Sequence, residues 1–145
     1  LTIDSLADPG HTLPDTMRKM LSLEISAKIQ NLALNYLEQE NEKILHEVHE
    51  LIDEARSLNM KFSFGGTGRY FYAKLSEMIR EVSDVPDADE VRYITGLISM
   101  ADWLHLYINK TALENQAFEI YQRYREEPEG ELSVLRPMFD WLNFE

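Results

Sequence analysis

The sequence predicts an all-α protein, an irregular bundle of about six helices around a central, mostly apolar fourth helix. Apolar residues recur at three- and four-residue steps in every long segment, and Pro, Gly and capping residues stand between the segments. No segment alternates apolar and polar residues convincingly, as a half-buried strand would. The 145 residues, 44% of them hydrophobic, fit one helical domain spanning residues 1–145.

Residues 1–11 contain Pro9–Gly10 and predict an irregular lead-in. Thr12 stands before Pro14 and Asp15, a pattern typical of a helix start with proline and a carboxylate in the first turn. The inward positions of this first helix are Met17, Met20, Leu21, Ile25, Ile29, Leu32, Tyr36 and Leu37.

A second helical pattern follows at Ile44, Leu45, Val48, Leu51, Ile52, Ala55 and Leu58. The polar stretch 38–43 that separates the two patterns has no Gly or Pro, so residues 14–59 could form one helix or two. We favour a turn near Asn41.

The stretch 59–68 ends the second pattern because it carries three glycines. A third helix then has Phe71, Leu75, Met78, Ile79 and Val82 on one side. Residues 84–87 end that helix and start the fourth. A fifth is predicted to open with a capping box at Thr111 and Glu114. After a loop at 126–130, the tail is bent at Pro137 and carries Leu132, Leu135, Met138, Phe139 and Leu142.

The fourth helix is apolar on most of its circumference. One face carries Ile94, Leu97, Ile98, Ala101, Leu104 and Ile108. The opposite side carries a protein-docking stripe of Arg92, Gly96, Ser99 and Trp103, with Leu106 and Tyr107 beside it. The small residues at positions 96 and 99 predict a shallow groove with Trp103 beside it as an anchor, which suits a partner helix or this chain's own segment 132–144.

Two one-turn pairs of potential metal ligands stand on different helices, His46 with His49 and Asp102 with His105. Facing pairs of this kind hold divalent metals in helix bundles. The helical wheel places His46 on the solvated side, opposite Val48, so we predict no metal site, and this set is kept only as an alternative.

The segment Gly65–Arg69 precedes the third helix, where free amide groups attract anions. The anion-binding candidates are Gly66, Thr67, Gly68 and Arg69. The segment lacks the Gly-Lys-Ser/Thr ending of a phosphate-binding loop, so the favoured interpretation is a glycine turn capped by Thr67.

The composition of the chain indicates which partners, compartment and chemistry to expect. The net charge of −12 disfavours nucleic acid, whose phosphates require clustered Lys and Arg. No stretch is long and apolar enough to span a membrane, and the chain has no cysteine, which fits a cytoplasmic protein. No serine, histidine or carboxylate pattern marks a catalytic site, so we expect neither catalytic residues nor a cofactor.

Four stretches resemble a known family: LPDTMRKML, HELIDEARSLNMKFS, GRYFYAKLSEMI and LISMADWLHLYINKTALENQAFEIYQR. Their succession is similar to the helical C-terminal region of α-amylase/α-mannosidase-like family 57 glycoside hydrolases. The stretch 113–117 keeps Gln116 but lacks that family's Trp and its Ala-Gln-Asn order. The resemblance implies an accessory domain without catalytic residues, because the family's catalytic carboxylates lie in a separate barrel that nothing here matches.

Three functions follow in order of preference. The first is a non-catalytic helical domain that docks on another protein or on another domain. The second is the accessory domain of a larger carbohydrate-active enzyme. The third is a metal-dependent helical-bundle enzyme that uses the two His-containing pairs. The sequence predicts no oligomeric state.

Overall fold

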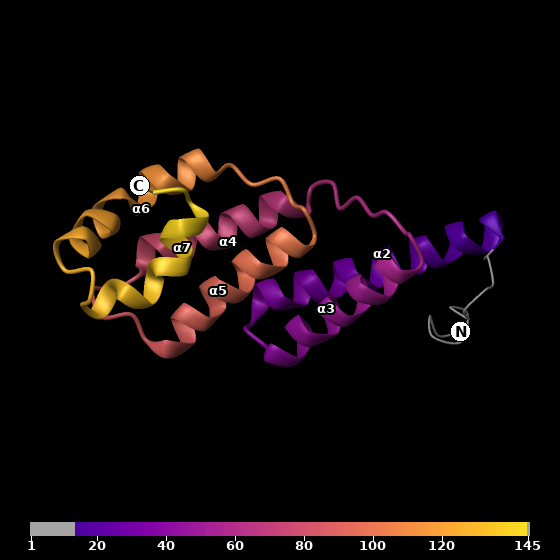
Figure 1. The fold of residues 1–145 in the computed structure, drawn as a ribbon, viewed down its shortest axis with the longest axis horizontal. Helices are drawn as coiled ribbons and strands as arrows, with labels where there is room; N and C mark the ends of the chain where they lie inside the picture. The colour runs from indigo at the N-terminus through magenta and orange to yellow at the C-terminus, as the bar shows by residue number, and fades with distance from the viewer. Residues whose placement is uncertain (1–13, 145) are drawn as a thin grey trace. The chain divides into compact units, whose positions relative to one another are not determined.

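The computed structural model of the chain describes residues 14–144 and confirms the predicted all-α class (Figure 1). Across these residues there are six α-helices, one 3-10 helix and no strand. The elements are α2 (Asp15–Glu38), α3 (Glu42–Ser57), α4 (Thr67–Glu81), α5 (Ala88–Trp103), α6 (Lys110–Glu126), η1 (Glu131–Leu135) and α7 (Arg136–Trp141). None of these helices is both long and apolar enough to cross a membrane.

The chain divides into two compact units, with the boundary between Thr67 and Gly68. In the first unit α2 and α3 pack together as a hairpin, and the second unit contains α5, α6, η1, α7 and nearly all of α4. This division does not test the single domain expected for residues 1–145, which stays a prediction.

The α2–α3 hairpin has the expected turn. Asn41 is the N-cap of α3, and its side-chain oxygen accepts a hydrogen bond from the Lys43 amide at 3.0 Å. Residues 15–57 are therefore two helices. At the other end of α2, Pro14 is the residue before the helix and not part of its first turn, while Thr12 lies outside the described residues. The residues of the hairpin helices that are buried are Leu21, Ile25, Ile29, Ala33, Tyr36, Val48, Ile52 and Ala55.

Three helices end on a non-glycine residue in the left-handed conformation. The residues are Asn59 after α3, His105 after α5 and Asn143 after α7, with φ of 54°, 52° and 63°. At α5 the Leu106 amide donates to the Ala101 carbonyl at 3.0 Å and the His105 amide to the Asp102 carbonyl at 3.2 Å. This is a Schellman motif, and it satisfies carbonyl groups that a helix end otherwise leaves without partners.

The core of the second unit matches the predicted apolar positions. All six residues assigned to the inner face of the fourth helix are buried, and so are the five apolar residues of the tail. The helix itself is shorter than expected, because the turn at His105 ends it at Trp103. Leu104 is consequently the cap residue, and Ile108 lies in the link to α6.

The capping box predicted for the fifth helix is wrong. α6 begins at Lys110, and its N-cap is Asn109, whose side-chain oxygen accepts from the Ala112 amide at 3.2 Å. Asparagine is at least as good an N-cap as threonine. Because Asn109 comes first along the chain, Thr111 lies inside the first turn.

Candidate functional site

Four of the predicted docking residues lie on α5, and the other two lie on the turn that follows it. Arg92 is exposed, Ser99 and Trp103 are half-buried, and Gly96 is buried, so Gly96 does not contribute an open groove. Nη1 of Arg92 is 3.2 Å from the Asp89 carboxylate, which engages part of its guanidinium group. Leu106 and Tyr107 are not on the helix at all but on the turn that follows it.

Tyr107 is the most exposed large apolar side chain of the described residues, at 88%. Its backbone, in contrast, is tightly packed. A β-carbon built on Gly68, in the first turn of α4, would lie 2.3 Å from the Tyr107 carbonyl oxygen. The Schellman motif at His105 precedes Tyr107 and the Asn109 cap follows it. The exposed ring therefore stands on a backbone that packs closely against Gly68 and lies between two hydrogen-bonded helix ends.

The tail folds back on the end of α5 beside this turn. Trp141 of α7 donates from its indole nitrogen to the Asp102 carboxylate at 3.0 Å. The ammonium of Lys110 lies 4.5 Å from the centre of the Trp141 ring. These two contacts fix α7 against α5 and against the start of α6 (Figure 1).

An aromatic cluster joins the tail to α6. Phe144 stacks on Tyr121 with ring centres 4.2 Å apart, and Phe139 contacts both rings. Arg136 donates to the Tyr124 hydroxyl at 3.0 Å, a hydrogen bond that raises the pKa of Arg136. The aromatic residues at the end of the chain thus form part of the protein's own packing.

The histidine pairs lie in different units. On α3, His46 is 2.9 Å from Glu50 and His49 is 3.4 Å from Asp53, all on the exposed face that the helical wheel predicted. In the second unit Asp102 accepts a hydrogen bond from Trp141 of the tail, and His105 lies in the turn that follows α5. Among residues 14–144, no group of three or more His, Asp and Glu side chains has a geometry suited to a metal ion.

The residues of the predicted anion site have separate surroundings. Gly66 is exposed, with φ of +87°, and Thr67 is the first residue of α4 and not its cap. The Thr67 hydroxyl is buried and accepts a hydrogen bond from Gln30 at 3.4 Å. Gly68 is buried, and Arg69 is exposed. Only Gly66 and Arg69 are therefore accessible to an anion.

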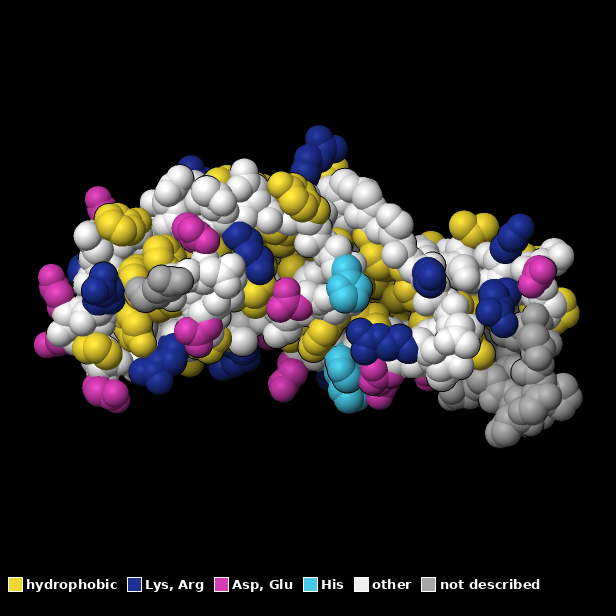
Figure 2. All heavy atoms as spheres, turned by 45° about the horizontal axis from the view of Figure 1, so that its top comes forward, with side chains coloured by type: hydrophobic (Ala, Val, Ile, Leu, Met, Phe, Trp, Pro, Cys, Tyr) yellow, Lys and Arg dark blue, Asp and Glu magenta, His cyan; other side chains and the backbone are white. Residues whose placement is uncertain are grey.

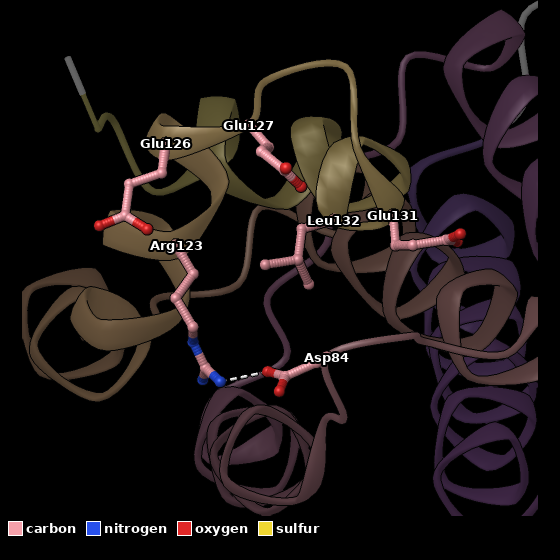
Figure 3. A pocket seen from close by; sticks show the side chains of 6 residues that line it. All are labelled: Asp84, Arg123, Glu126, Glu127, Glu131 and Leu132. Atoms are coloured by element: carbon pink, nitrogen blue, oxygen red, sulfur yellow. Dashed lines mark hydrogen bonds and ion pairs between the residues drawn. The ribbon is translucent and has the colours of Figure 1, made fainter.

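The second unit also contains an acidic hollow of about 460 Å³ that the sequence did not predict (Figure 3). The run of glutamates from 126 to 131 was its only sequence signal. The hollow is lined by Asp84, Arg123, Glu126, Glu127, Glu131 and Leu132. Arg123 is paired with Asp84, as Figure 3 shows, so the other carboxylates set the local charge. The lining holds no histidine and no hydroxyl nucleophile.

Comparison with known proteins gives no relative of this chain. No family model matches the sequence, and no match was found among curated proteins or solved structures. The similarity to family 57 glycoside hydrolases therefore stays a prediction from the quoted motifs.

Proposed function

We propose that the chain is a non-catalytic helical module that binds another protein, and that Tyr107 is the centre of the contact surface. Trp103 and Leu106 lie close to it in sequence and are each half-buried. The observation that carries this proposal is the contrast at Tyr107 between an 88% exposed ring and a tightly packed backbone.

Such an arrangement favours binding for two physical reasons. Tyrosine covers a large apolar area and has few rotatable bonds, so it dominates many interfaces. A backbone that is already fixed loses little conformational entropy when a partner binds. Truncation of a central aromatic residue costs at least about 2 kcal/mol in many interfaces. Tyr107→Ala is therefore expected to weaken partner binding by roughly thirtyfold.

The charge of the chain indicates which charge its partner should carry. A net charge of −12 repels acidic surfaces at low ionic strength, so a neutral or basic protein is the expected partner. The lack of cysteine supports placing this interaction in a reducing compartment such as the cytoplasm.

Site-specific photo-crosslinking in the native cell tests the proposal. A photoreactive phenylalanine analogue at position 107 should give one discrete crosslinked species. The same analogue at position 118 is the matched control, because Phe118 is also exposed, at 51%, but lies on α6. Circular dichroism checks that both variants are folded. Equal crosslinking at the two positions, or none at position 107, would contradict the proposal.

The resemblance to family 57 gives the same surface a different partner. If the chain is an accessory domain, Tyr107 would meet another domain of the same enzyme. The crosslink would then form within one polypeptide, which mass spectrometry of the crosslinked peptides distinguishes from a crosslink to a separate protein.

A further inference from the structure

Helix α2 has apolar residues on two opposite sides. Its inner side carries the buried residues that pack in the first unit. Its other side, in the first half of the helix, carries an exposed row of Met17, Met20, Leu23 and Ala27, which we call the outer stripe. The inward positions predicted for Met17 and Met20 are therefore wrong. The steps of three and four residues keep this row on one face of the helix.

The outer stripe exposes large apolar side chains to solvent. Leu23 is 74% exposed and Met20 is 67% exposed. α2 has 24 residues whereas α3 has 16, and Figure 1 shows the start of α2 extending past the end of α3. In Figure 2, hydrophobic and basic side chains are exposed together around the start of α2. A contiguous apolar patch with a charged rim is typical of a protein interface.

The spacing within the stripe specifies the kind of partner. Met20, Leu23 and Ala27 follow the three-then-four step by which two helices pack side by side in a coiled coil. The next position in this series, Gln30, donates to Thr67 and is exposed, so the apolar seam ends at Ala27. The seam is short, and it therefore predicts a weak association that depends on concentration.

Charges at the two edges of the stripe complement each other in a second copy. Lys19 lies on one edge and Glu24 on the other, five residues further along. In a parallel helix pair, these are the flanking positions that face each other between the two chains. Lys19 of each copy would therefore pair with Glu24 of the other.

The local charge also favours a second copy at this place. The first half of α2, residues 15–28, contains three basic and two acidic residues, Arg18, Lys19, Lys28, Asp15 and Glu24, and so carries +1. The whole chain carries −12. Two copies that meet through this segment repel each other less than they would through the more acidic parts of the chain.

We propose that α2 pairs in parallel with α2 of a second copy through the outer stripe. This pairing is independent of Tyr107 and of its proposed partner, because the two features lie in different units.

Sedimentation velocity of the whole chain over about 1 to 500 µM tests the proposal, because mass action makes a weak dimer dissociate on dilution. The wild-type chain should change from monomer to dimer over this range. Leu23→Glu should raise the dimer dissociation constant at least thirtyfold, which corresponds to about 2 kcal/mol. Phe118→Glu is the matched control, since it makes the same kind of change at an exposed apolar residue of the second unit and should leave dimerisation unchanged.

Charge exchange tests the parallel pairing. Lys19→Glu and Glu24→Lys should each weaken the dimer, and the double variant should restore it, because the exchange re-forms the pair with opposite polarity. A dimer that tolerates Leu23→Glu, or a double variant that fails to restore association, would overturn the proposal. So would a wild-type chain that stays monomeric while Leu23→Glu lowers its melting temperature, since the stripe would then be covered within one chain.

Discussion

Gly68→Ala tests the packing that holds Tyr107 in place. The added β-carbon would lie 2.3 Å from the Tyr107 carbonyl oxygen and 3.3 Å from its carbon, whereas ordinary contact begins at 3.4 Å. The oxygen must therefore retreat by 3.4 − 2.3 = 1.1 Å. It belongs to the backbone, so the turn that carries Tyr107 has to move with it.

Two opposing effects set the magnitude. Overpacking of this kind costs about 1–3 kcal/mol. Alanine gains at most about 1 kcal/mol over glycine in a helix interior, and less in the first turn, where Gly68 lies. We therefore expect a net loss of about 1–2 kcal/mol in the free energy of unfolding, together with weaker crosslinking at position 107.

Equilibrium urea unfolding, followed by circular dichroism, measures this loss. The corresponding alanine variants of two neighbouring glycines serve as the comparison. Gly65 has open space around it and no left-handed conformation, so Gly65→Ala should leave stability unchanged or raise it by up to about 1 kcal/mol. Gly66 also has open space, but its φ is +87°, so Gly66→Ala should cost about 1–2 kcal/mol through backbone strain. If Gly68→Ala is as stable as Gly65→Ala, the close approach to Tyr107 does not exist.

Substitutions at three further positions test the packing, a helix end and a titrating group. Leu97→Ala on α5 removes a fully buried side chain and should cost about 2–5 kcal/mol in urea unfolding; a loss below about 0.5 kcal/mol would place Leu97 at the surface. His105→Gly should raise stability by about 0.5–1 kcal/mol, because glycine adopts the left-handed conformation without strain, while His105→Val should lower it. Burial, and then repulsion from Asp87, raises the pKa of Glu90. Because the pKa of Glu90 is higher in the folded chain than in the unfolded chain, its protonated form stabilises the fold at pH values below the unfolded-state pKa. This contribution is lost as pH rises through the folded-state pKa. Glu90→Gln should therefore raise the melting temperature at pH 7, and this gain should shrink below about pH 4. A gain in melting temperature that is the same at pH 7 and below about pH 4 would contradict this reasoning.

The helical fold was readable from the sequence because its signals are local. Apolar spacing located the core positions of α5 and of the tail, and Asn41 marked the turn between α2 and α3. Helix ends were less predictable. The same spacing continues through Leu104 and Ile108, and nothing in the sequence singles out His105 as a left-handed residue, because glycine is the usual one at that position.

The candidate site was predictable only in part, because exposure depends on contacts between distant segments. The wheel placed Gly96 and Trp103 on one side of a helix, but it could not show that Gly96 is buried. The approach of Gly68 to Tyr107 joins residues 39 positions apart. The acidic hollow likewise requires Asp84 and Arg123, which only the fold brings together.

The contact between Trp141 and Asp102 has a consequence for the order of folding during synthesis. The two residues are 39 positions apart, whereas α2 and α3 are adjacent in the chain and can pair as soon as both have left the ribosome. The apolar surface of α5 and α6 that the tail covers stays open until residues 132–142 have been made. A nascent chain paused between α6 and the tail would therefore expose that surface, and this is the stage at which chaperone binding or aggregation is expected.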